Sequence, residues 1–401
     1  MRLLKSVVGA LTLASVLYQT AAAQDTFSGS VTLETRAFPN TALFSEQHGA
    51  LVSVTAEPRF FFLSESGAHT LTFSPFGRID SGDSERTHFD IRELYWQTYG
   101  DRWELSAGLL WTFWGVTESQ HLVDVINQTD LVENPDGEDK LGQPAVQGTW
   151  LADWGTIDLF LLPYFRERTF PGVDGRLRFP IPVDTDAAEV ERTLGVAARW
   201  FHTLGSLDLG LSTFFGTARE PRLRVISDGG PPTAVVPLYE RIHQVGVDAQ
   251  LISGSWLWKF EGITRSGQGD RFFSTVAGFE YTLANMKNSG ADLGLIAEYN
   301  HDTRGPAGSA DEPLSLSFFD NDLFMGGRLA LNDVQSSELL GGAVVDVELG
   351  TVSWLIEASR RVGSTFTADL EVRAFSNVDP TDPVYSLRRD SFVQLGFSFF
   401  Y

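Results

Sequence analysis

The chain has 401 residues, with 30 Lys and Arg against 52 Asp and Glu and a formal net charge of −22 at pH 7. So acidic a chain repels polyanions, which argues against nucleic acid as a partner. It has no cysteine, which excludes disulfide bonds and thiolate metal sites, and its 12% aromatic content is unlike that of a disordered chain.

The first 23 residues have the order expected of a secretory signal peptide. A basic start and a short apolar run are followed by three alanines before Gln24. The apolar run is shorter than the roughly 20 residues that a membrane-spanning helix needs. We therefore expect residues 1–23 to be a cleaved signal peptide; the alternatives are a retained anchor or a buried helix.

The rest of the chain alternates apolar with polar or small residues, in runs separated by turns rich in Gly, Asp, Asn or Ser. Strict alternation predicts strands, and a length of roughly ten residues is that of a tilted strand crossing a bilayer. Runs of this kind include GSVTLETRAF, RWELSAGLLWTFWG, SWLWKFEGITR and TFTADLEVRAF.

The connections between these runs alternate between short and long. Short ones such as YGDR, TLGS and ISGS alternate with long ones such as residues 116–144, 168–192 and 301–321. Bacterial outer-membrane barrels have this asymmetry, with tight periplasmic turns and longer outward loops. We predict an all-β fold: a transmembrane antiparallel up-and-down β-barrel of about 18 strands, or 16 if one run is wrongly divided, in a single domain over residues 24–401.

The chain ends within a strand pattern, SFVQLGFSFFY, in which Val393, Leu395, Phe397, Phe399 and Tyr401 share one face. We expect this run to close the barrel against the first strand, the alternative being the edge strand of a soluble fold. It resembles the C-terminal signature that the assembly machinery of outer-membrane barrels recognises. The resemblance implies recognition through Phe397, Phe399 and Tyr401 and a place in the outer membrane of a Gram-negative bacterium, among its lipid and lipopolysaccharide.

Charged residues within the strands keep to one face, as Glu34 does with Arg36 and Lys259 with Glu261. A cationic side chain facing lipid at mid-bilayer costs roughly 2–4 kcal/mol, so these charges should face the lumen. They either line an aqueous pore or form a self-neutralising network that fills the barrel. The predicted pore-lining residues are Glu34, Arg36, Glu57, Arg59, Asp90, Arg92, Lys259, Glu261, Arg265, Asp346, Glu357, Arg361, Asp369, Glu371 and Arg373.

Residues 116–144 are unusual for an outer loop because they are both apolar and acidic. Leu122, Val123, Val125 and Ile126 would gain nothing from exposure to water. We expect the loop to fold into the lumen, with its apolar side on the wall and its carboxylates narrowing the pore and concentrating cations. The predicted constriction residues are Glu118, Asp124, Asn127, Asp130 and Glu133.

Three other interpretations of this loop stay open. It could be a solvated loop that binds lipopolysaccharide through divalent cations, or it could line an active site. It could also hold Ca²⁺, because NPDGED offers oxygen ligands, although the spacing of an EF-hand loop is missing. Metal binding is therefore left undecided.

The same segment carries a resemblance. Trp114 and Gly115 are followed by DVINQTDL, which is similar to the WG … INP-D stretch of proteobacterial outer-membrane barrels of unknown function and, more distantly, of alginate-export-type barrels. LPYFRERTFPG resembles the strand end and loop that follow there, while Gln128 stands where those proteins usually have Pro. The resemblance covers residues 92–172. It implies a porin-like barrel with no particular substrate, and the acidic loop would repel an acidic polysaccharide.

No recognisable catalytic motif occurs in the sequence. The histidines are scattered, and the one conceivable base, His88 beside Asp90, is more often an ion-pair element on a strand. We therefore predict a non-enzyme without a cofactor: an outer-membrane porin-like channel for passive or facilitated diffusion of small hydrophilic solutes, with a preference for cations. The alternative is a lumen-blocked structural, adhesion or lipid-processing barrel.

Overall fold

The computed structural model describes residues 26–227, 229–304, 313–315, 317 and 319–401. The expected signal peptide, residues 1–23, lies outside the described residues. In the described part of the chain, no helix is long and apolar enough to cross a membrane.

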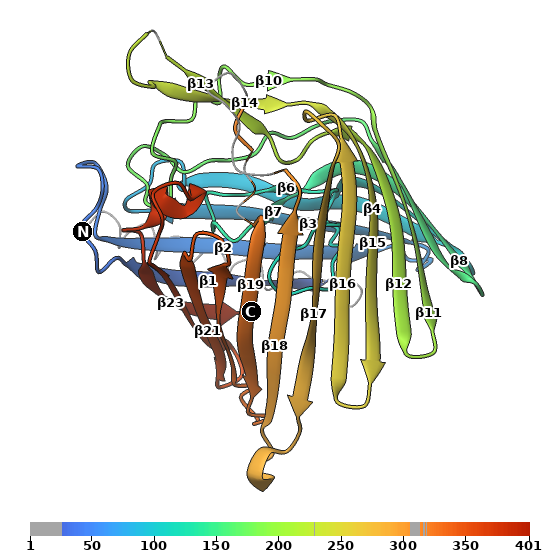
Figure 1. Ribbon diagram of the computed structural model, residues 1–401. Helices are drawn as coiled ribbons and strands as arrows, with labels where there is room; N and C mark the ends of the chain where they lie inside the picture. The colour runs from blue at the N-terminus through green and yellow to red at the C-terminus, as the bar shows by residue number, and fades with distance from the viewer. Residues whose placement is uncertain (1–25, 228, 305–312, 316, 318) are drawn as a thin grey trace.

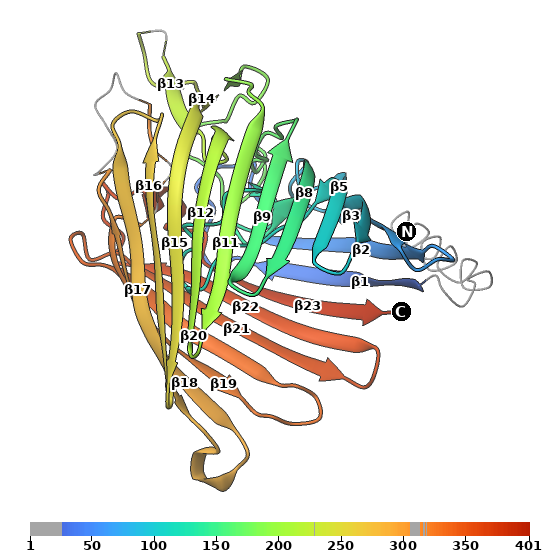
Figure 2. The same ribbon diagram turned by 90° about the vertical axis from the view of Figure 1, so that its right-hand side faces the viewer.

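Eighteen antiparallel strands form one sheet that closes on itself (Figures 1 and 2). Each strand pairs with its neighbour in the chain, and β23 pairs back with β1, where Val31 lies opposite Phe399. This confirms the predicted up-and-down barrel of about 18 strands. In order around the wall the strands are β1 (Thr26–Ala37), β2 (Ala50–Leu63), β3 (His69–Asp80), β4 (His88–Tyr99), β5 (Trp103–Leu110), β8 (Gln143–Ala152), β9 (Gly155–Leu162), β11 (Gly195–Leu204), β12 (Leu207–Thr217), β15 (Arg241–Ser253), β16 (Trp256–Ser266), β17 (Phe272–Leu283), β18 (Asp292–Asp302), β19 (Asn321–Ala330), β20 (Glu338–Asp346), β21 (Val352–Val362), β22 (Phe366–Ser376) and β23 (Phe392–Phe400).

The remaining elements belong to connections. β10 (Glu189–Val190), β13 (Arg222–Ile226) and β14 (Ala234–Tyr239) form a small three-stranded sheet above one end of the barrel (Figure 1). β6 (Gln128–Thr129) and β7 (Lys140–Leu141) pair within the connection between β5 and β8. Two short 3-10 turns occupy Met286–Asn288 and Pro383–Leu387. The long connections share the end that carries the small sheet, which we call the long-loop end; the opposite end is the short-turn end.

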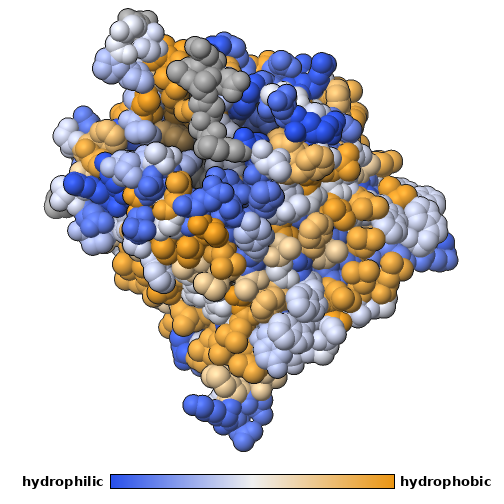
Figure 3. All heavy atoms as spheres, in the orientation of Figure 1, coloured by the Kyte–Doolittle hydropathy of each residue, from blue (hydrophilic) through white to orange (hydrophobic). Residues whose placement is uncertain are grey.

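The two faces of the wall differ in polarity, as the alternation requires. On β1 and β23, the apolar Leu33 and Leu395 are 49% and 57% exposed on the outer face, while Glu34 and Arg36 are buried inside. Apolar side chains cover much of the barrel surface between its polar ends (Figure 3). An apolar belt of this kind is what hydrocarbon surroundings stabilise, and in water it would be unfavourable.

Candidate functional site: the inserted loop and the space beside it

The connection between β5 and β8, residues 111–142, lies inside the barrel, and we call it the inserted loop. Its apolar residues Leu122, Val123, Val125 and Ile126 are buried, with Val123 and Ile126 fully so. They pack with inward-facing side chains of the wall strands β8, β9, β11, β12 and β15–β17 and fill that side of the lumen. The cluster comprises Leu110, Trp114, Leu122, Val123, Val125, Ile126, Ala145, Phe160, Leu162, Ala197, Phe214, Ala218, Ile242, Ile263, Phe272 and Val276.

Glu261 on β16 holds the first part of the inserted loop through backbone amides. Its carboxylate accepts hydrogen bonds from the amides of Val116, Thr117 and Val123 at 2.7, 3.1 and 3.2 Å, and from the Thr117 hydroxyl at 2.8 Å. Glu261 is fully buried, so these donors replace the water that a carboxylate would otherwise keep.

Glu298 on β18 acts in the same way. Its carboxylate accepts hydrogen bonds from the amides of Glu118 and Ser119 and from the Ser119 hydroxyl, each at 2.8 Å. Glu298 is also almost fully buried. We call Glu261 and Glu298 the carboxylate clasp, because together they fix residues 116–123 against the wall.

His121 adds a charged contact to the clasp. Its Nε2 lies 3.0 Å from the Glu138 carboxylate, and its Nδ1 lies 4.0 Å from Glu261. Burial alone would lower the pKa of His121, but these two carboxylates raise it to about 10. The ring is therefore protonated at neutral pH, and its charge ties the two arms of the inserted loop to the wall.

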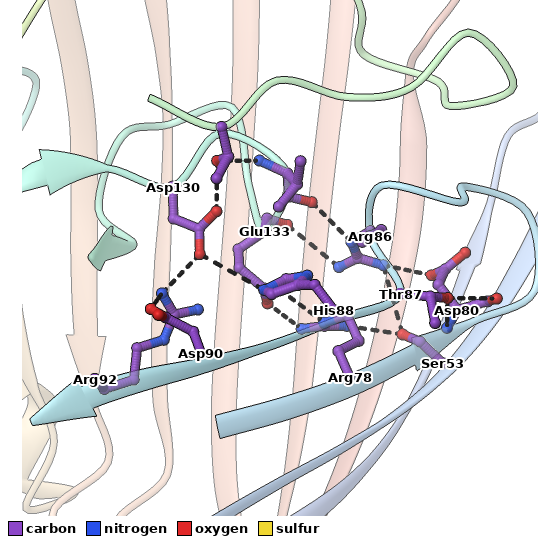
Figure 4. A network of polar contacts seen from close by, with 12 residues as sticks. Ser53, Arg78, Asp80, Arg86, Thr87, His88, Asp90, Arg92, Asp130 and Glu133 are labelled. Carbon is purple, nitrogen blue, oxygen red and sulfur yellow. Dashed lines mark hydrogen bonds and ion pairs between the residues drawn. The ribbon is translucent and has the colours of Figure 1, made fainter. Parts of the chain in front are cut away.

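The middle of the inserted loop is held by arginines from the opposite wall (Figure 4). Arg92 contacts Asp130 at 2.6 Å, and Arg78 donates two hydrogen bonds to Glu133 at 2.5 and 3.1 Å. Arg86 donates to the carbonyl oxygen of Glu133. Asp130 and Glu133 are buried, so each of these two predicted constriction carboxylates is neutralised by a guanidinium rather than free in a pore.

Two further predicted constriction residues stabilise the loop from within. Asp124 lies 3.1 Å from Lys140, and burial raises the pKa of Asp124 while Lys140 opposes that effect. The Asn127 amide donates to the carbonyl oxygens of Leu110 and Leu141. Both residues thus serve the conformation of the loop.

Glu118 differs from the other predicted constriction residues because it faces open space. It contacts Arg328 on β19 at 2.6 Å and lies 3.7 Å from Lys259 on β16. Glu118 lines two cavities that lie between the inserted loop and the wall formed by β19–β23.

These two cavities adjoin. The larger, of about 510 Å³, reaches Asp382 at the long-loop end, and the smaller, of about 360 Å³, reaches Glu338 near the short-turn end. Glu118, Leu340 and Glu357 line both. The space beside the inserted loop therefore extends along most of the height of the wall, and we call it the side passage.

One arginine joins three carboxylates in the side passage. Arg373 on β22 contacts Asp136 of the inserted loop at 2.9 Å, Glu357 at 3.0 Å and Glu371 at 2.8 Å. One guanidinium thus faces three carboxylates, which leaves an excess of negative charge.

Two groups of side chains in the described part of the chain are close enough to share a metal ion. They are the Asp136, Glu357 and Glu371 carboxylates, and the set of His88, Asp130 and Glu133. Arginines already contact the carboxylates of both groups, and a bound cation would compete with them.

The predicted pore-lining residues fall into different surroundings. Those that line the side passage are Asp346, Glu357, Asp369, Glu371 and Arg373. Those that hold the inserted loop are Arg92, Lys259 and Glu261.

The other predicted pore-lining residues lie away from the side passage. Glu34 contacts Arg78 and Arg86, and Arg36 donates to Gln394. Asp90 pairs with Arg166, and Arg265 pairs with Glu220. The more exposed members are Glu57, Arg59 and Arg361.

Residues that the sequence analysis missed include Arg78, Glu298 and Arg328. All three lie on strands at inward-facing positions, so the same parity rule could have found them. Asp136 was also missed; it lies in the NPDGED stretch, but its position carries no signal for its contact with Arg373.

Neither a known protein family nor a curated protein matches the sequence. Solved structures with a similar fold include Wzi, an Escherichia coli outer-membrane protein involved in group 1 capsule assembly and described as a carbohydrate-binding β-barrel. It aligns with a TM-score of 0.54 and 11% identity over 97% of this chain and 87% of that one. A mutant of the Rhodopseudomonas blastica porin aligns with a TM-score of 0.45 and 8% identity over 94% of this chain and 100% of the porin. At such identities the likeness to Wzi shows the barrel fold alone.

Proposed function

We propose that this protein is an outer-membrane channel for passive or facilitated diffusion of small hydrophilic solutes. The observation that carries the proposal is the pair of adjoining cavities that share Glu118, Leu340 and Glu357 and extend from Asp382 toward Glu338. Charged side chains and water-sized space in the same passage suit hydrated solutes. The inserted loop fills the other side of the lumen, so solutes would cross the barrel through the side passage.

The proposed location follows from the outer face. Exposed apolar side chains such as Leu33 and Leu395 require a lipid environment, and lipopolysaccharide and phospholipid would supply it. Residues 1–23 would direct export, and Phe397, Phe399 and Tyr401 would be read by the barrel-assembly machinery. The strand β23, which carries Phe397 and Phe399, pairs with β1 and closes the wall.

The proposed channel prefers cations, through a different set of carboxylates from the one expected. Asp124, Asp130 and Glu133 are neutralised in ion pairs. The larger cavity is lined by seven carboxylates, against two arginines and His121. This imbalance in a narrow passage would concentrate cations and repel anions. The seven are Glu118, Asp136, Glu138, Asp322, Asp346, Glu357 and Asp382.

A second candidate function is a lumen-blocked barrel with a structural, adhesive or lipid-processing role. It is favoured by the buried apolar cluster that fills one side of the lumen and by the clasp that fixes residues 116–123 there. In this case the side passage would be a closed series of pockets.

Conductance across a planar bilayer separates the two functions. The channel predicts discrete ohmic current steps and a reversal potential that favours cations under a salt gradient. A silent bilayer, recorded with protein that is correctly folded by circular dichroism, would favour the blocked barrel. Liposome swelling with sugars, amino acids and organic acids would then identify the class of solute.

A further inference from the structure

A third cavity, of about 500 Å³, lies at the long-loop end of the barrel and shares Pro171, Arg178 and Phe179 with the larger cavity of the side passage. The loop between β3 and β4 forms one side of it, and residues 166–185 form the other. Its lining is predominantly polar and includes His88, Arg166, Arg168 and Arg178. Arg178 lines the larger cavity of the side passage as well, so it stands between the two spaces.

Arg178 carries a buried guanidinium that forms no ion pair with a described carboxylate. The residue is 9% exposed, and its guanidinium lies 3.9 Å from the ring centre of Phe44. Nη1 donates to the carbonyl oxygen of Phe179, whereas Nε has no hydrogen-bond partner in the described structure. Burial lowers the pKa of Arg178, and the more distant Glu46 and Asp390 only oppose that effect. Such a charge is costly to keep unpaired.

The neighbouring side chains of His88 and Arg168 also form few hydrogen bonds. Neither ring nitrogen of His88 forms a hydrogen bond in the described structure, although Nε2 lies 3.4 Å from the Glu133 carboxylate. Arg168 donates from Nε to the Gln128 side chain and forms no ion pair with a described residue. Side chains with unused hydrogen-bonding nitrogens therefore line this cavity.

The carboxylates that line the cavity do not pair with Arg168 or Arg178. Asp90 is bound by Arg166 at 2.8 Å, and Glu167 lies 3.6 Å from Arg192. Glu85 is exposed to water and forms no ion pair with a described residue. No described carboxylate contacts Arg168 or Arg178, so both guanidinium groups keep donors with which an added anion could pair.

We propose that this cavity binds a small oxyanion, a carboxylate or a phosphate group, through Arg178 with Arg168 and His88 as further donors. A guanidinium offers paired N–H donors that match two oxygens of either group. The site adjoins the carboxylate-lined cavity of the side passage through Arg178, and its existence does not depend on whether the barrel conducts.

Isothermal titration calorimetry on the full-length protein in detergent tests the proposal. Sodium succinate and inorganic phosphate are titrated separately at constant ionic strength, with glucose as a neutral comparison. We expect one site for succinate, for phosphate or for both, and none for glucose. The loss of a charged hydrogen bond should weaken this binding by about tenfold or more in Arg178→Gln. Arg178→Lys, which keeps the charge, should lose less.

Arg224→Gln is the matched control, because Arg224 is an exposed arginine that pairs with Glu189 and does not line the cavity. It should bind like the unmodified protein. If Arg178→Gln does not yield a folded barrel, Arg168→Gln is titrated in its place, and its binding should be weakened in the same way. The proposal is overturned if neither anion binds the unmodified protein, or if the folded arginine variant binds as tightly as the control.

Discussion

At the scale of single residues, the most consequential groups are the two carboxylates of the clasp. Glu261 and Glu298 are buried and form no ion pair with an arginine or lysine of the described chain, and backbone amides of the inserted loop supply most of their hydrogen bonds. A glutamine in either place would bring an NH₂ group toward N–H donors and leave some of them unsatisfied.

Glu261→Gln should therefore loosen the inserted loop without removing the barrel. Losing hydrogen bonds to a charged group lowers the free energy needed to open the loop locally. Amide exchange in residues 116–123 should therefore speed up by about tenfold or more. Hydrogen–deuterium exchange by mass spectrometry measures this. Glu104→Gln is the control, because the Glu104 carboxylate accepts a hydrogen bond from Gln97 and has no described contact with the inserted loop. Equal protection of residues 116–123 in both variants would contradict the claim that the carboxylate clasp holds the inserted loop.

His121 makes the attachment of the inserted loop depend on pH. Its pKa is raised from 6.5 to about 10 in the folded protein, so the stabilisation is complete below about pH 6.5 and is lost as the pH rises through 10. Amide exchange of residues 116–123, corrected for intrinsic rates, should accelerate between about pH 7 and pH 10. His121→Gln should show no such acceleration, and a pH dependence unchanged by this substitution would contradict the assignment.

At the scale of elements, alternation predicted the strands and their faces because the period of a strand is two and each inward position repeats. Leu33 and Glu34 could be sorted in this way from the sequence alone. The contacts of the inserted loop could not be, because Glu298 lies 180 residues beyond Glu118 in the chain. Acidity of the loop suggested free carboxylates, but their charge depends on arginines brought in by the closure of the barrel.

The assignment of faces predicts unequal effects for two adjacent residues of β23. Leu395 is 57% exposed on the outer face, whereas Gly396 faces inward near Asp369. Leu395→Arg should lower the free energy of unfolding by roughly 2–4 kcal/mol if it lies at mid-bilayer, and Gly396→Arg should cost clearly less. Urea unfolding in lipid vesicles compares the two. A larger loss for Gly396→Arg would reverse the assignment.

At the scale of the whole molecule, the lumen is divided into a packed side and a side passage. The packed side explains why residues 116–144 combine apolar with acidic character, since one group of side chains meets the apolar wall and the other meets arginines. Charge selectivity should therefore follow the passage and be insensitive to charges already neutralised on the packed side.

Glu357→Gln combined with Glu371→Gln should reduce cation selectivity, because it removes two of the three carboxylates around Arg373. The reversal potential under a salt gradient should move toward zero or change sign. Asp158→Asn is the comparison, because Asp158 lies on β9, where it is hydrogen-bonded to Thr149, and lines neither cavity of the side passage. If the reversal potential moved equally in both proteins, the side passage would not be what determines charge selectivity.

The central claim is that solutes cross the barrel between the inserted loop and the wall formed by β19–β23. The chain has no cysteine, so Ser359→Cys places a single thiol in the cavity nearer the short-turn end. A membrane-impermeant thiosulfonate reagent is added in planar bilayers from the long-loop side. The account predicts current steps that fall as the thiol is modified through the passage. Steady current with an unmodified thiol, or a bilayer without current, would contradict it.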